Sequence, residues 1–134
     1  MEKLSTIITI ILLIGVLFYV LYINGYMVIK SISAIAFIGS IGRFKNRSKA
    51  TFLACNGYIK KVIKFKESRE YQFIFNCTIS KGDIVVEVQN RHKETVLVLD
   101  TVHRNGVLDA HCAERYYLIL KFKKADGSFE LTWS

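Results

Sequence analysis

The feature that most constrains this chain is an uncharged apolar segment near its N-terminus, residues 4–23, with the sequence LSTIITIILLIGVLFYVLYI. Twenty residues is the length that an α-helix needs to cross the hydrocarbon core of a bilayer. Each Leu, Ile, Val or Phe favours insertion by roughly 0.3–0.6 kcal/mol at the helix centre. The segment is longer than the apolar region of an ordinary cleavable signal peptide. We therefore expect a transmembrane helix over residues 4–23.

A second apolar stretch follows at residues 26–42, but it contains Lys30 and three serines and would insert weakly on its own. If it folds back after Asn24-Gly25, its small residues Ala36 and Ser40 allow it to pack against the first helix. A helical hairpin places the N-terminus and the following basic run in the cytoplasm, as the positive-inside rule prefers. The other arrangement is a single span with an interfacial second segment. In both arrangements, residues 1–42 form the membrane anchor.

The positive charge of the chain lies beside this anchor. The formal net charge is +8, and residues 43–66 hold eight basic residues and no acidic residue. Such a cluster attracts anionic lipid headgroups, at roughly 1 kcal/mol per Lys or Arg near the surface. A solvated charged face is the alternative, and nucleic acid is not expected as a partner. The predicted headgroup-binding residues are Arg43, Lys45, Arg47, Lys49, Lys60, Lys61, Lys64 and Lys66.

After residue 49 the hydrophobic period becomes two, which is typical of strands with one buried face. Residues 71–79 and 84–89 alternate in this way around Lys81-Gly82-Asp83, so we expect a hairpin there. A second hairpin is expected around Asp126-Gly127. The total is six or seven short strands. This pattern predicts an all-β antiparallel sandwich or jelly roll over residues 50–134, joined to the N-terminal transmembrane helix or helical hairpin by a basic linker at residues 43–49.

The runs YQFIFNCTISKGDIVVEVQN, ETVLVLD and RYYLILKFKKADGSFELTWS also carry a resemblance. They resemble small β-sandwich domains that Gram-positive bacteria attach to their membranes and, more remotely, pre-peptidase C-terminal and galactose-binding-like jelly rolls. The similarity covers roughly residues 50–134 and consists of a Lys-Gly-Asp turn, a strand with paired tyrosines and a final strand ending in Trp133. The resemblance implies a β-sandwich outside the cell with no assigned activity, and it transfers no functional residue.

Few side chains suggest chemistry. His103, Asp109, His111 and Cys112 offer ligand types that zinc prefers, but their spacing matches no known zinc site, so we expect no metal and no other cofactor. Adjacent residues on a strand point to opposite faces, which argues against a catalytic pair at His111-Cys112. We therefore expect no enzymatic activity.

Aromatic side chains give a weak indication of a ligand site. Tyr58 and Tyr117 are the candidates for an exposed platform, because Trp133 alternates with core residues.

The sequence as a whole indicates a non-catalytic β-sandwich that acts as a binding or assembly module at a cell membrane. Its expected partner is the lipid bilayer, and a protein or glycan ligand is unidentified. One alternative is an exported module that binds cell-wall or glycan ligands, and a more remote one is a metal- or thiol-dependent enzyme. The membrane face of the domain stays open, because charge favours the cytoplasm and the resemblance favours the outside.

Overall fold

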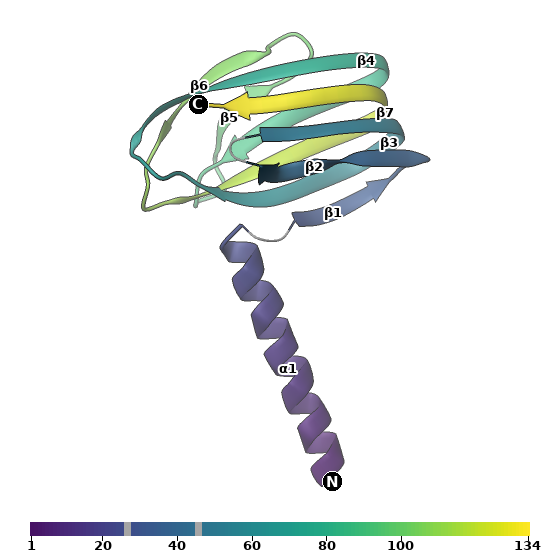
Figure 1. Cartoon of the computed structure of the whole chain (residues 1–134), viewed down its shortest axis with the longest axis vertical. Coiled ribbons are helices and arrows are strands. Elements are labelled where there is room, and N and C mark those ends of the chain that lie inside the picture. The colour runs from purple at the N-terminus through teal and green to yellow at the C-terminus, as the bar shows by residue number, and fades with distance from the viewer. Residues whose placement is uncertain (26–27, 45–46) are drawn as a thin grey trace.

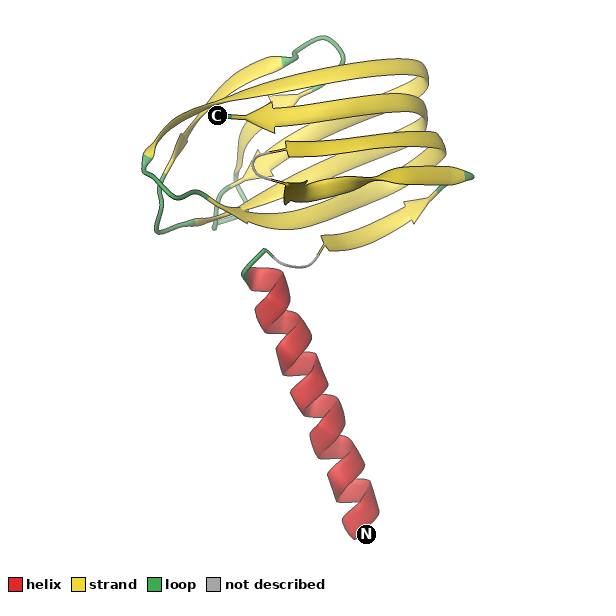
Figure 2. Ribbon diagram, viewed as in Figure 1, coloured by secondary structure: helices red, strands yellow, loops and turns green. Residues whose placement is uncertain are grey.

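A computed structural model describes residues 1–25, 28–44 and 47–134. This part of the chain contains one helix and an antiparallel seven-stranded arrangement, as the sequence predicts (Figure 2). The elements in chain order are α1 (Glu2–Ile23), β1 (Val28–Ser33), β2 (Ala36–Phe44), β3 (Arg47–Lys64), β4 (Arg69–Gln89), β5 (Thr95–Leu99), β6 (Asn105–Ala110) and β7 (Arg115–Trp133).

Helix α1 projects away from the β domain (Figure 1). None of its side chains is buried, although most of them are apolar. Its length and composition are sufficient to cross a membrane. Within the described residues, it is the one helix with this property.

The stretch at residues 26–42 differs from the expected second span. Most of its described residues form β1 and β2, both of which pair antiparallel with β3. Ile32 and Phe37 turn inward and pack against the core, whereas Ile29 and Ile38 are exposed. The polar and small residues that weaken membrane insertion of this stretch therefore belong to strands in which inward and outward side chains alternate. Strand β3 begins at Arg47, so residues 47–49 of the expected linker also belong to the sheet.

The three long strands β3, β4 and β7 each bend at the same end of the molecule and contribute to both layers of the sandwich (Figure 1). Layer I contains residues 47–52, 69–79 and 127–133 of these strands, with β2 at one edge and β6 at the other. Layer II contains residues 57–64, 83–89 and 115–122, with β1 and β5 at its edges. The core lies between the layers.

The prediction of two hairpins is therefore wrong. Lys81-Gly82-Asp83 and Asp126-Gly127 are bends inside continuous strands, and the two halves of each strand lie in opposite layers. Gly82 and Gly127 have φ values of 73° and 149°, which suit a sharp change of direction as well as they suit a hairpin turn. Each half pairs with a neighbouring long strand instead of with its own other half.

The inward faces form one apolar core rich in aromatic rings. Phe73 stacks on Trp133 with ring centroids 5.5 Å apart, and Phe52 meets Phe122 edge to face at 5.0 Å. Trp133 is buried, as its alternation with Phe129 and Leu131 predicts. The outward faces of the two layers are consequently the surfaces on which a site can lie.

Candidate functional site

The first candidate surface lies where the C-terminal end of α1 meets layer II. Asn24 follows the helix, and its side-chain oxygen accepts a hydrogen bond of 3.0 Å from Lys64 Nζ on β3. Gly25 lies against the backbone oxygen of Val62, which is 1% exposed although it lies outside the main core cluster. The helix end therefore contacts the outer face of β3, and the strand edge nearest to it is β1 (Figure 1).

Aromatic and basic side chains gather at this contact. Tyr58, which is 44% exposed, and Tyr117 both lie near Tyr22 on α1. Lys60 Nζ lies 4.8 Å from the centroid of the Tyr117 ring, a cation–π contact. We call Tyr22, Tyr58, Lys60, Lys64 and Tyr117 the junction cluster. Both tyrosines that the sequence singled out belong to it.

Lys93 adds a further positive charge to this region. Burial lowers the pKa of Lys60, and the charge of Lys93 lowers it further. Lys93 lies in the connection between β4 and β5 and adopts φ of 62°. Sequence reasoning missed this proximity, because 32 residues lie between Lys60 and Lys93.

The structure divides the predicted headgroup-binding residues among several places. Lys60 and Lys64 belong to the junction cluster, Lys66 is exposed just beyond β3, and Lys61 is only 8% exposed. Burial lowers the pKa of Lys61. Two other members lie on the outer face of layer I: Arg47 and Lys49. Lys45 lies outside the described residues, as does the side chain of Arg43.

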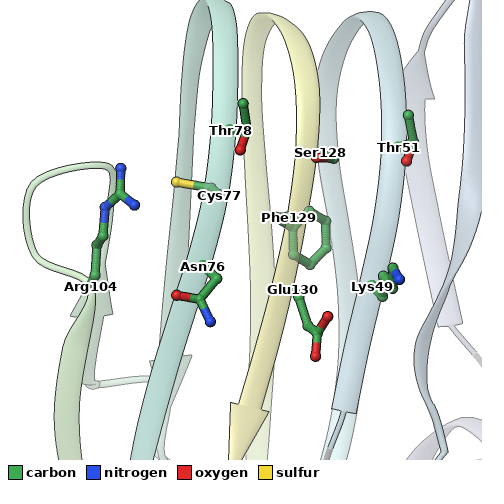
Figure 3. Close-up of a pocket in the computed structure, with 9 residues that line it drawn as sticks. All are labelled: Lys49, Thr51, Asn76, Cys77, Thr78, Arg104, Ser128, Phe129 and Glu130. Carbon is green, nitrogen blue, oxygen red and sulfur yellow. The ribbon is translucent and has the colours of Figure 1, made fainter.

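The second candidate surface is a pocket of about 440 Å³ on layer I (Figure 3). Its floor comes from neighbouring strands, and Arg104 approaches from the connection between β5 and β6. The lining residues are Lys49, Thr51, Asn76, Cys77, Thr78, Arg104, Ser128, Phe129 and Glu130. We call this pocket the polar groove.

Strand register orders the polar side chains of the groove into two rows. Thr51 on β3 faces Ser128 on β7, which in turn faces Thr78 on β4. The next row is Lys49, Glu130 and Asn76. Pairing across three bent strands produces these rows, so the sequence alone could not identify them.

The residues considered for metal or thiol chemistry do not converge. In the described ranges, no group of three or more His, Cys, Asp and Glu residues could hold a metal ion. His103 Nδ1 lies 3.3 Å from Asp100, while the backbone N–H of Cys112 donates to Ser68 Oγ at 3.0 Å. Cys112 is exposed, whereas burial raises the pKa of Cys55 to about 11.

Comparison with known proteins gives no family. No protein-family model matches the chain, and no curated protein does. Among solved structures, the Yersinia pseudotuberculosis-derived mitogen has 8% identity and a TM-score of 0.47, covering 79% of this chain and 86% of the mitogen. The Aeromonas hydrophila PliG lysozyme inhibitor has 9% identity and a TM-score of 0.46, over 66% and 84% of the two chains. A family 6 carbohydrate-binding module has 11% identity and a TM-score of 0.40, over 81% and 92%. At these values, no functional conclusion follows from the similarities.

Proposed function

We propose that this chain is a membrane-anchored, non-catalytic β-sandwich that binds or assembles partners at the bilayer surface. The supporting observation is α1, whose 22 residues are largely apolar and contribute no buried side chain. Apolar surface left in water costs roughly 25 cal/mol per Å². A bilayer removes that cost, because the helix has the length of a membrane span.

The junction cluster supports a defined orientation of the domain. If α1 crosses the membrane, its C-terminal end lies at the level of the headgroups, where tyrosine rings are favoured. Lys60 and Lys64 then lie where anionic phosphates attract basic side chains. Lys66 belongs to the same proposal because it is exposed two residues beyond the end of β3. In this account, anionic lipid holds the β domain against the bilayer.

Lysine labelling tests the headgroup contact. The full chain is placed in nanodiscs of neutral lipid or of neutral lipid with anionic lipid added, and an amine-reactive reagent is followed by mass spectrometry. We expect Lys60 and Lys64 to react several-fold more slowly in anionic discs and to recover at high salt, because salt screens charges over about 8 Å at physiological ionic strength. Lys81 is the exposed internal control, because it lies at the bend of β4, a strand that carries no member of the junction cluster. Equal labelling of Lys60 and Lys64 in both kinds of disc would contradict the contact.

The second candidate function is an exported module that binds a glycan in the polar groove. Its supporting observation is the row of three hydroxyl side chains across layer I, which can hydrogen-bond a polyhydroxylated ligand. This function requires the domain to lie outside the cell. A topology reporter fused after Ser134 separates the alternatives, because a cytoplasmic reporter rules out a cell-wall ligand.

A further inference from the structure

We propose that the polar groove binds an anionic, hydroxyl-rich ligand whose negative groups are held by Lys49 and Arg104. The inference rests on the groove and not on the anchor, so it can fail while the membrane proposal holds. It also narrows the second candidate function by naming the charge of the ligand.

The groove has the size of a small-ligand site and a mostly polar lining. Its volume of about 440 Å³ lies within the range of roughly 300–1,000 Å³ typical of ligand pockets. Thr51, Ser128 and Thr78 present hydroxyl groups in one row across three neighbouring strands. Strands lie about 4.8 Å apart, so this row spans about 10 Å. Such a row offers donors and acceptors to successive hydroxyl groups of an extended ligand.

The charge of the groove is positive because its carboxylate is already paired. Glu130 Oε1 lies 3.3 Å from an Arg47 guanidinium nitrogen. Lys49 faces Glu130 across the strands but makes no ion pair within the described part of the chain. Arg104 likewise forms no ion pair there. Two cations therefore remain available to a ligand. Lys49 lies on β3, and Arg104 lies in the connection between β5 and β6, next to β4.

Two hydrogen bonds hold Arg104 in place, one through its backbone and one through its side chain. Its carbonyl oxygen accepts a hydrogen bond of 2.7 Å from the Phe75 N–H, and its Nε donates to the Thr101 oxygen at 3.0 Å. The two terminal nitrogens make no hydrogen bond within the described residues. Figure 3 shows this guanidinium beside Cys77, at the β4 side of the groove. A fixed guanidinium with free terminal N–H groups suits a carboxylate or a phosphate.

The groove lacks an aromatic platform within its described lining, and this favours charge over stacking. Its one aromatic residue, Phe129, is 2% exposed and contacts the rings of Phe75 and Phe122 in the core. A neutral sugar would gain hydrogen bonds but no stacking contact. An anionic ligand also gains charge-assisted hydrogen bonds, which are roughly twice as strong as neutral ones.

Titration calorimetry of the full chain in neutral-lipid nanodiscs tests the proposal. The probes are trigalacturonate, a trimer of glycerol phosphate and the neutral sugar galactotriose. We expect one or both anionic probes to bind, and to bind at least about 10-fold more tightly than galactotriose. Binding of trigalacturonate alone identifies carboxylates as the ligand groups, and binding of glycerol phosphate alone identifies phosphates.

Variants then locate the binding. Lys49→Gln and Arg104→Gln should each weaken the anionic probe about 10-fold, which corresponds to about 1.4 kcal/mol. Lys123→Gln lies on layer II and should leave binding unchanged. Ser128→Ala removes one hydroxyl without changing charge and should weaken binding less than either cation variant. Thermal unfolding verifies that each variant is folded. Equal binding of galactotriose, an equal loss in Lys123→Gln, or no binding of either anionic probe to the folded protein overturns the proposal.

Discussion

At the scale of single residues, Asp126 connects the bends of the three long strands. Its carboxylate accepts a hydrogen bond from the backbone N–H of Ala54 in β3, and its carbonyl oxygen accepts one of 3.3 Å from Ser80 Oγ in β4. Ala54 adopts φ of 50°, which is costly for a residue with a Cβ. The contact with Asp126 helps to compensate for that cost at the corner of the sandwich.

Asp126→Ala should lower the free energy of unfolding by about 1–3 kcal/mol, because the Ala54 N–H loses a charged acceptor. Asp126→Asn keeps an oxygen at the same position and should lose less than half as much. Thermal or denaturant unfolding of the full chain in micelles measures both changes. Equal stability of the wild-type and Ala proteins would contradict a role for Asp126 at the corner.

The buried thiol of Cys55 should make the free energy of unfolding depend on pH. Burial raises the pKa of its thiol from 9.0 to about 11 in the folded chain, so folding favours the protonated form. This stabilisation is fully present below pH 9 and is lost as pH rises from 9 to 11. The loss should reach about 2–3 kcal/mol. Denaturant unfolding across this interval checks it, and Cys55→Ala should flatten the decline. An unchanged slope in Cys55→Ala would contradict the assignment.

At the scale of elements, the sequence predicted α1 and most inward-facing positions, but not the path of the strands. The alternation of Phe73 and Phe75 identified a buried face without help from distant residues. Gly82 and Gly127 predict hairpins but form bends within continuous strands, because a glycine with positive φ is compatible with either geometry. The groove was missed entirely, because its members come together through register between strands that are far apart in the chain.

The assignment of residues 28–33 to a strand can be tested at Gly57. A Cβ at this position would meet the backbone oxygen of Ser31 on β1, and φ is 120°. Gly57→Ala should therefore displace β1 and destabilise the domain by at least about 1 kcal/mol. Hydrogen exchange of the β1 amides should accelerate in this variant. Gly15→Ala is the matched control, because beyond the neighbouring backbone of its own helix no atom lies within 4 Å of the added Cβ. Unchanged exchange in β1 would contradict its pairing with β3.

At the scale of the whole molecule, the chain consists of a largely apolar helix that buries none of its side chains and a sandwich with its own core. The junction cluster joins the two parts through Lys64 and Asn24. The polar groove lies on layer I, whereas the helix end contacts layer II. In this arrangement, one surface of the domain is assigned to the membrane and another remains available to a ligand.

Flotation of the full chain with lipid vesicles after an alkaline carbonate wash is the most direct test of membrane anchoring. We expect the intact 15.4 kDa polypeptide to float with the lipid, because the wash releases proteins held by charge alone and leaves α1 in the bilayer. Recovery of the uncleaved chain as a monomer in the aqueous fraction without detergent would contradict the central claim.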